Sequence, residues 1–348
     1  MAQDAFQSWA GYEAVVNSGR CAPTWTIYHR AVIDGQRQLC DLGWVLVHLS
    51  DRGREGKGWS RLPLFVLLFA PCVVLLCCSC RTQTAAAPRA VATLSRRITL
   101  TGKEVPVDFY LPRGARTAPV VVIAHGFTRS RLNMAGWGGL LASNGFIVAI
   151  PDLPALTKRE QNGRAIGELL DVIDKGEVIT QPKAAGGAAL MGYSMGGLSA
   201  LLAASGNPQV RCWIGLDPVN AGRKGAEAAA SLTIPCAVLR AEPATWNLRG
   251  NARRLARHLT GPFITLRVRD ARHSDPEDPT DSLAEMLCGK SDPRRHRTFE
   301  RYTLATLRAV FFGDPASLAV LRSASADPAV ADVAFRKLED FPADGRVY

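Results

Sequence analysis

One serine in the middle of the chain has the neighbours that a nucleophile requires. Ser194 lies in the run Gly192-Tyr193-Ser194-Met195-Gly196, after an apolar stretch and directly before an alanine- and leucine-rich segment. A G-x-S-x-G run between a strand and a helix forms a sharp turn that exposes the serine hydroxyl, and small residues are needed beside it to avoid collisions. The pattern predicts a nucleophile at Ser194, and the alternative is a glycine-rich turn whose serine does no chemistry.

A nucleophilic serine needs a general base, and the base needs an acid that orients it. Of the six histidines, His273 is the candidate base, since it follows the last predicted strand in a loop. Asp217 and Glu242 each follow a predicted strand and are the two candidate acids. Asp217 has a second interpretation, as a turn-forming residue before Pro218.

The negative charge that develops on an attacked carbonyl must be bound by two backbone N–H groups. One comes from the residue after the nucleophile, and the other from the loop after the third strand. We therefore predict the Met195 and Phe127 amides as the oxyanion hole, with Gly126 letting the backbone approach the substrate. We expect His125 to hold this loop by hydrogen bonding.

These residues need a scaffold that brings strand ends together. Short runs rich in Val, Ile and Leu occupy residues 118–125, 145–152, 187–194, 210–218, 234–242 and 262–270. Continuous apolar runs are typical of parallel strands covered on both faces. Residues 96–101 and 105–112 predict an antiparallel start, and residues 164–173, 195–204 and 298–312 have helical patterns. The fold class is therefore α/β, and its chemistry is expected at the carboxyl ends of the strands.

With a serine, an acid and a histidine in that chain order, residues 91–313 resemble the α/β-hydrolase superfamily. The run WIGLDPVNAG at 213–222 is similar to the strand and turn that carry the acid in the chlorophyllase family, and VVIAHGF at 121–127 is similar to its oxyanion loop. Platelet-activating-factor acetylhydrolases share this acid position, and polyester and dienelactone hydrolases are more distant relatives. The resemblance implies the α/β-hydrolase fold, with a mostly parallel central sheet and helices on both faces.

The resemblance also bears on the acid and on the activity. Many hydrolases of this fold place the acid one strand later, in a Glu-x-Asp run, but the residue two after Glu242 is Ala244. We therefore favour Asp217, with Glu242 as the alternative. Plant chlorophyllases carry arginine directly after the nucleophile, where this chain has Met195. The implied activity is that of a related carboxylic-ester hydrolase, a serine esterase that needs no metal and no organic cofactor.

Two other functions share these residues. A peptidase or an acyltransferase of the same fold would use the same triad, and a non-catalytic, membrane-anchored binding protein could descend from one. The substrate is expected to be a small-molecule, lipid or polymer ester. Four side chains are candidates to line an apolar cleft for it: Phe127, Trp137, Met195 and Trp246.

A charge-free apolar run of 19 residues, 62–80, lies between Arg61 and Arg81. It is long enough to span a bilayer and also has the composition of a signal-peptide core. The run LLCCSC at its end loosely resembles a lipoprotein processing site. We predict an N-terminal extension at 1–60, a signal peptide or membrane anchor at 61–81, a linker at 82–90, a catalytic domain at 91–313 and a C-terminal tail at 314–348. The protein is thus expected to be exported or membrane-anchored rather than cytoplasmic.

The net charge of +11 does not by itself indicate a nucleic-acid partner. Residues 247–258 form the densest basic stretch, but no aromatic residues alternate with its arginines, so a solvated helix face is favoured over a nucleic-acid patch. Of the nine cysteines, only Cys212, Cys236 and Cys288 fall in the predicted catalytic domain, so at most one disulfide can form within it.

Overall fold

A computed structural model describes residues 88–220 and 222–341. The predicted extension at 1–60, the predicted signal or anchor at 61–81 and most of the predicted linker at 82–90 lie outside the described residues. Among the described residues, no helix is long and apolar enough to cross a membrane. The apolar run at 62–80 lies outside that search.

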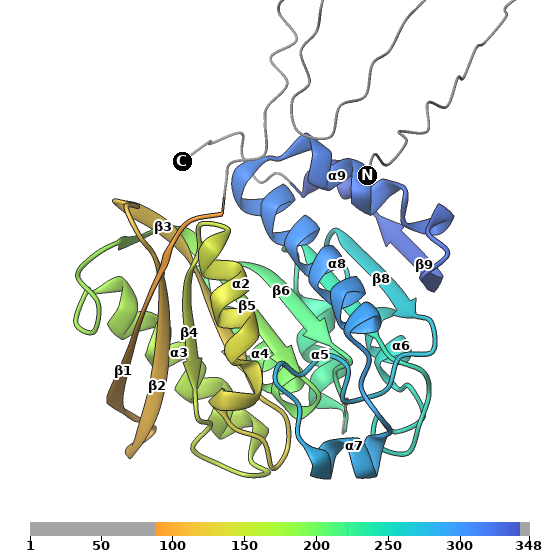
Figure 1. Ribbon diagram of the computed structural model, residues 1–348, viewed down its shortest axis with the longest axis horizontal. Coiled ribbons are helices and arrows are strands. Elements are labelled where there is room, and N and C mark those ends of the chain that lie inside the picture. Colours follow the sequence, from red (N-terminus) through yellow and green to blue (C-terminus); the bar gives the residue numbers. More distant parts are fainter. Residues whose placement is uncertain (1–87, 221, 342–348) are drawn as a thin grey trace, which may run out of the picture. The chain divides into compact units, whose positions relative to one another are not determined.

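The described residues form a nine-stranded sheet with the order β1-β2-β4-β3-β5-β6-β7-β8-β9 (Figure 1). Strands β3 to β8 run parallel to one another, whereas β1, β2 and β9 join through antiparallel pairs. The strands are β1 (Val91–Leu100), β2 (Lys103–Pro112), β3 (Thr117–Ala124), β4 (Ile147–Pro151), β5 (Lys183–Tyr193), β6 (Val210–Leu216), β7 (Cys236–Arg240), β8 (Phe263–Val268) and β9 (Val330–Arg336). The predicted antiparallel start and the six predicted parallel strands are confirmed.

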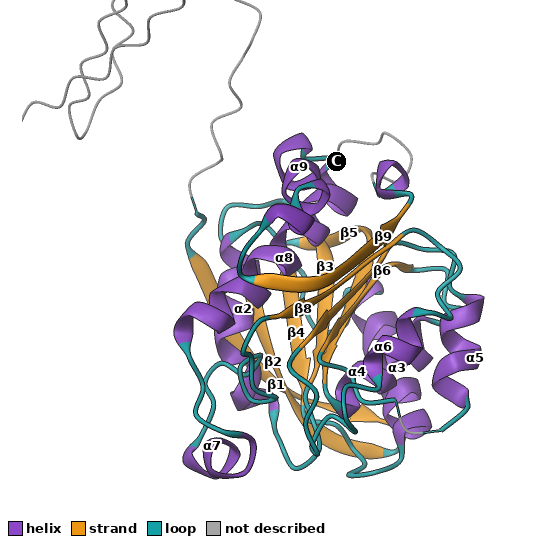
Figure 2. Ribbon diagram, turned by 90° about the vertical axis from the view of Figure 1, so that its right-hand side faces the viewer, coloured by secondary structure: helices purple, strands orange, loops and turns teal. Residues whose placement is uncertain are grey.

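Helices cover both faces of the sheet (Figure 2). One face packs against α2 (Ala135–Ser143), α8 (Pro293–Phe312) and α9 (Pro315–Arg322), and the other against α3 (Arg159–Asp174), α4 (Met195–Ala204), α5 (Lys224–Ser231) and α6 (Ala252–Ala256). The connections hold the remaining helix, α7 (Ser282–Cys288), and the short 3₁₀ turns η2 (Arg131–Met134), η3 (Ala324–Ala326) and η4 (Leu338–Asp340). All five residues of β4 and of β7 are buried, as expected for strands covered on both faces. The predicted fold class is confirmed.

Helix α8 begins and ends where its sequence requires. Asp292 caps its N-terminus by accepting a hydrogen bond from the Arg294 N–H, and Pro293 occupies the first turn. Gly313 ends the helix in the left-handed conformation, with a φ of 60°. The chain then forms α9 and β9, so the predicted tail supplies a helix and a strand that pairs with β8.

The basic stretch at 247–258 contains only the short helix α6. Its arginines are exposed, while Ala252 and Leu255 face the core. Leu248 is exposed, because it precedes the helix in a turn with a φ of 49°. Within the described residues all three cysteines are free, and burial raises the pKa of both the Cys212 and the Cys236 thiol.

Candidate active site

Ser194 lies in a strained turn between β5 and α4. Its φ of 54° and ψ of −120° fall outside the usual regions for a residue with a side chain. Two backbone hydrogen bonds hold the turn: the Ser194 N–H donates to the Leu216 carbonyl (3.0 Å), and its own carbonyl accepts from the Val219 N–H (2.9 Å). The strain is therefore borne by contacts with the end of the neighbouring strand β6.

The glycines beside Ser194 are required by close backbone approach. A Cβ at Gly192 would lie 2.4 Å from the Gly196 carbonyl oxygen. A Cβ at Gly196 would lie 2.3 Å from the carbonyl oxygens of both Ala124 and His125. A larger residue at Gly192 would collide with the start of α4, and one at Gly196 would push the turn away from the end of β3.

The His273 ring lies between Ser194 and Asp217. Its Nδ1 is 2.6 Å from the Asp217 Oδ2 atom, and its Nε2 is 2.9 Å from the Ser194 Oγ atom. An ionised carboxylate only accepts hydrogen bonds, so Nδ1 carries the proton and Nε2 is left to accept from the serine hydroxyl. The Tyr193 ring stacks on the imidazole with a centroid separation of 5.1 Å. All four side chains are buried.

Asp217 receives two further hydrogen bonds. The Ala241 N–H donates to its Oδ1 atom, and the Asn247 side-chain amide donates to its Oδ2 atom, both at 3.0 Å. Asn247 is itself fixed, because its side-chain oxygen accepts from the N–H groups of Ala244 and Gly250. No motif in the sequence marks Asn247, since its contact with Asp217 joins loops that follow different strands.

Glu242, the alternative acid, has other partners. Its Oε1 atom forms an ion pair with Arg267 and accepts a hydrogen bond from the Asp270 N–H. The structure thus brings Asp217 to His273 and gives Glu242 a place in an ion-pair cluster beside β8.

The two residues predicted as oxyanion donors lie on segments that meet at Ser194. Met195 is the first residue of α4, where helix geometry leaves the N–H without an intrahelical carbonyl. Phe127 follows Gly126 in the loop after β3, and a Cβ at Gly126 would lie only 2.9 Å from the Tyr193 ring. This loop is therefore held against the nucleophile turn.

His125 is bound on both nitrogens. Its Nδ1–H donates to the Gly126 carbonyl and its Nε2 accepts from the Leu153 N–H, each at 2.9 Å. Burial lowers the pKa of His125, which favours the neutral ring that this pattern needs. The His125 side chain therefore links the loop after β3 to the segment that follows β4.

An ion-pair cluster that could not be seen in the sequence joins the loop after β3 to the loop after β8, which carries His273. Arg129 Nη2 donates to Glu277 Oε2 (2.9 Å) and to Asp281 Oδ2 (2.7 Å). Asp281 also caps α7 by accepting from the Ala284 N–H. One arginine therefore holds together the loop after β3, the loop after β8 and the start of α7.

The sequence was compared with known protein families. The family described as PET hydrolase-like matches residues 83–245, which contain both Ser194 and Asp217. The matched stretch is similar to this family, and the sheet with helices on both faces is that of an α/β-hydrolase fold. The chlorophyllase-like detail of the sequence analysis stays a prediction.

Curated relatives match shorter stretches of the chain. Cutinase est2 of Thermobifida alba is 29% identical over 136 residues, covering 38% of this chain and 44% of the relative. A bis(hydroxyethyl) terephthalate hydrolase of Streptomyces coelicolor is 35% identical over 105 residues, covering 30% of this chain and 34% of the relative. A cutinase of Thermobifida fusca is 31% identical over 112 residues, covering 31% and 35%. The chain spans less than half the length of these relatives.

Four side chains were expected to line an apolar cleft, but Trp137 is not available for one. It is buried in α2, where its Nε1–H donates to the Pro276 carbonyl (2.7 Å). It is a packing residue because its indole N–H meets a partner inside the protein. Met195 is buried, whereas Phe127 and Trp246 are each nearly half exposed.

Proposed function

We propose that this protein hydrolyses carboxylic esters through Ser194, His273 and Asp217. The observation that carries the proposal is the His273 ring, hydrogen-bonded to the serine hydroxyl on one side and to a buried carboxylate on the other. The PET hydrolase-like family match and the cutinase relatives support the same reaction class.

The chemistry follows from the hydrogen-bond pattern. His273 Nε2 takes the proton from Ser194 Oγ as the oxygen attacks the ester carbonyl, and the Asp217 carboxylate stabilises the imidazolium that forms. The Phe127 and Met195 N–H groups bind the tetrahedral oxyanion, each contributing about 3 kcal/mol to the transition state. His273 then returns the proton to the departing alcohol. A water, deprotonated by the same ring, attacks the acyl-enzyme and releases the acid.

The substrate class we infer is that of apolar esters, including polyester chains. Exposed apolar side chains lie on the loops after β3 and β7 and on α7: Phe127, Trp246, Leu283, Met286 and Leu287. Trp246 Nε1–H donates to the Leu287 carbonyl (2.7 Å), so α7 is bound to the loop after β7. An exposed apolar group of this kind suits adsorption to an insoluble or oily ester.

We propose further that residues 62–80 direct export or anchor the protein to a membrane, because they carry no charge and have charged residues on both sides. Fractionation of bacteria expressing the full chain tests this. We expect the protein in the periplasm, the medium or the membrane, and a 62–80 deletion in the cytoplasm. Equal distribution of the two would overturn the proposal.

Turnover of p-nitrophenyl esters with short and long acyl chains tests the activity. We expect the full chain to hydrolyse them and Ser194→Ala to lose activity by at least about 10³-fold. If no acyl length is turned over above the rate of the variant, the protein is not an esterase.

The substrate class has its own test. Adsorption to a polyester film should fall in a Leu283→Ser/Met286→Ser variant while hydrolysis of p-nitrophenyl acetate stays unchanged. Equal adsorption by the two proteins would contradict the assignment of α7 to substrate binding.

A further inference from the structure

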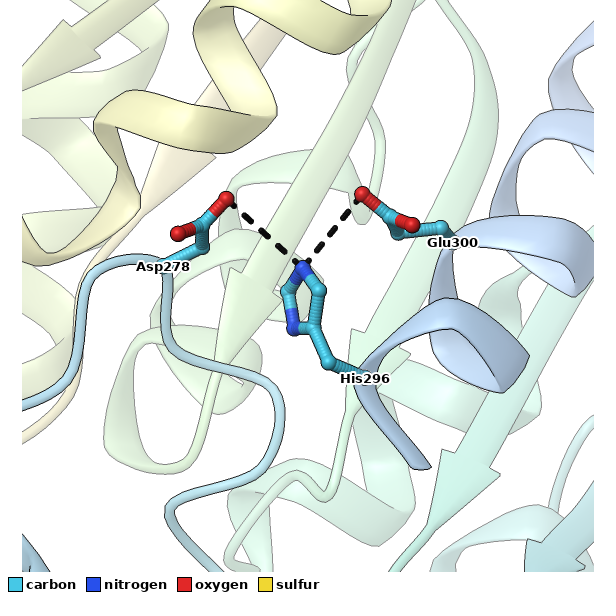
Figure 3. A group of neighbouring side chains, drawn as sticks. All are labelled: Asp278, His296 and Glu300. Carbon is cyan, nitrogen blue, oxygen red and sulfur yellow. Dashed lines mark ion pairs between the residues drawn. The ribbon is translucent and has the colours of Figure 1, made fainter. Parts of the chain in front are cut away.

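A second cluster of chemically active side chains lies away from the triad, where the His273 loop meets α8 (Figure 3). Asp278 comes from that loop, and His296 and Glu300 come from successive turns of α8. Residues four apart on a helix lie on the same face. Ligand atoms of the three side chains lie within 4.8 Å of one another.

The His296 ring is oriented so that its Nε2 atom faces the two carboxylates. Its Nδ1 lies 2.8 Å from the Asp275 carbonyl, which can only accept, so Nδ1 carries a proton. Its Nε2 lies 3.8 Å from Asp278 Oδ2 and 3.4 Å from Glu300 Oε1, as Figure 3 shows. The Nε2 atom is buried and has no hydrogen-bond partner. Three potential ligand atoms therefore face one another.

The surrounding contacts hold these ligands in place. The Asp278 N–H donates to the Asn133 carbonyl, and the Asp278 carbonyl accepts from the Gly136 N–H. A Cβ at Gly136 would lie 1.7 Å from Asp278 Oδ2, so the glycine leaves the space that the carboxylate occupies. The Trp137 ring packs edge-on against the His296 imidazole, with centroids 5.3 Å apart.

The two carboxylates of the cluster have few side-chain cations nearby. Within the described residues, ion pairs join Asp278 and Glu300 to His296 alone. The nearby Arg295 is paired with Asp275 and Asp292. A bound cation would supply the missing positive charge.

We propose that Asp278, His296 and Glu300 bind a divalent transition-metal ion of the zinc class. One imidazole and two carboxylates are ligands that Zn²⁺ accepts, and an Nδ1–H donated to a carbonyl is the usual support of a metal-binding histidine. Tetrahedral Zn²⁺ separates its ligand atoms by about 3.4 Å. The 3.4 Å between His296 Nε2 and Glu300 Oε1 matches this spacing. Asp278 Oδ2 is 3.8 Å from Nε2 and the three ligand atoms lie within 4.8 Å of one another, so the carboxylates would close in on a bound ion.

An ion at this position would couple two parts of the protein. Asp278 lies five residues after His273, whereas His296 and Glu300 belong to α8, which packs on the sheet. Binding would therefore tie the His273 loop to the body of the protein and stabilise the folded state by mass action. Asp278 and Glu300 remain partly exposed, so the ion can enter from solvent.

Titration of the full chain, without a purification tag and stripped by a chelator, tests the proposal. Calorimetry with ZnCl₂ should show one equivalent bound, and Co²⁺ should give the visible absorption of a low-coordinate site. We expect His296→Gln, Asp278→Asn and Glu300→Gln each to weaken Zn²⁺ binding at least tenfold and to remove the Zn²⁺-dependent rise in Tm.

Two matched variants control for binding elsewhere. His258→Gln removes an exposed histidine and Asp174→Asn an exposed carboxylate on α3, and both should bind Zn²⁺ like the parent protein. Circular dichroism checks that each variant is folded, and Glu300→Gln, which keeps the side-chain shape, serves if His296→Gln is not. Absence of Zn²⁺ binding, or binding unchanged by Glu300→Gln, would overturn the proposal and identify His296 as an imidazolium held between two carboxylates.

Discussion

The Arg129 guanidinium lies on the loop that carries the Phe127 amide and binds Glu277 on the loop that carries His273, with Nη2 and Oε2 2.9 Å apart. The Glu277 side chain is almost fully buried. The predicted oxyanion donor and the predicted base are thus held by one ion pair. Their relative position depends on this pair because the two loops follow different strands, β3 and β8.

Removing one partner of this pair should destabilise the protein more than removing both. We expect Arg129→Met to lower the free energy of unfolding by about 3 kcal/mol, since it leaves the Glu277 charge buried and uncompensated. Arg129→Met/Glu277→Gln should recover part of that loss. Urea unfolding of the single and double variants measures the coupling, and additive effects would show that the pair does not join the loops.

The two candidate acids should separate clearly by mutation. We expect Asp217→Asn to lower kcat by about 10³–10⁴-fold, because the amide cannot stabilise the imidazolium and favours the wrong tautomer. Glu242→Gln should leave kcat within a few-fold and act mainly on stability, since Glu242 binds Arg267. Ester turnover by both variants decides, and a larger loss in Glu242→Gln would reverse the assignment.

Asn247 should act as a positioning residue. Asn247→Ala removes the amide that binds Asp217 Oδ2, and we expect kcat to fall about tenfold with little change in KM. Asn144→Ala is the matched control, since it removes an amide hydrogen bond to the Leu140 carbonyl on α2. If the two variants have equal kcat, Asn247 is only a structural residue.

His125 should make stability depend on pH. Burial lowers the pKa of His125 below the usual 6.5. On acidification the ring is therefore protonated in the unfolded chain at a higher pH than in the folded protein. The stabilisation is therefore complete above about pH 6.5 and is lost as the pH falls below that value. His125→Gln cannot be protonated, so its free energy of unfolding should fall less between pH 7 and pH 5. Parallel urea titrations measure this, and identical slopes would contradict it.

Local patterns were enough to predict the strand ends that carry Ser194, Asp217 and His273. Each residue ends or follows an apolar run, and a parallel sheet brings such ends to one edge. The structure places these three side chains in hydrogen-bond contact. The G-x-S-x-G pattern also located the turn, because a sharp strand-to-helix turn needs small residues beside the serine.

Contacts between loops could not be predicted in the same way. Arg129 and Glu277 are 148 residues apart, and Asn247 and Asp217 are 30 apart. The residues next to each of these side chains in the sequence do not indicate its partner. Trp137 was placed in the cleft because composition does not tell which side of a helix faces the core. The proposed metal ligands could not be predicted either, because Asp278 and His296 belong to different elements.

The central claim is that Ser194 is a nucleophile activated by His273 and Asp217. Labelling the full chain with a p-nitrophenyl phosphonate and measuring its intact mass and tryptic peptides tests this most directly. We expect one adduct per chain, on Ser194, with p-nitrophenol released in equal amount, and strongly slowed labelling in His273→Gln. A chain that stays unlabelled, or that is labelled equally well as Ser194→Ala, would contradict it.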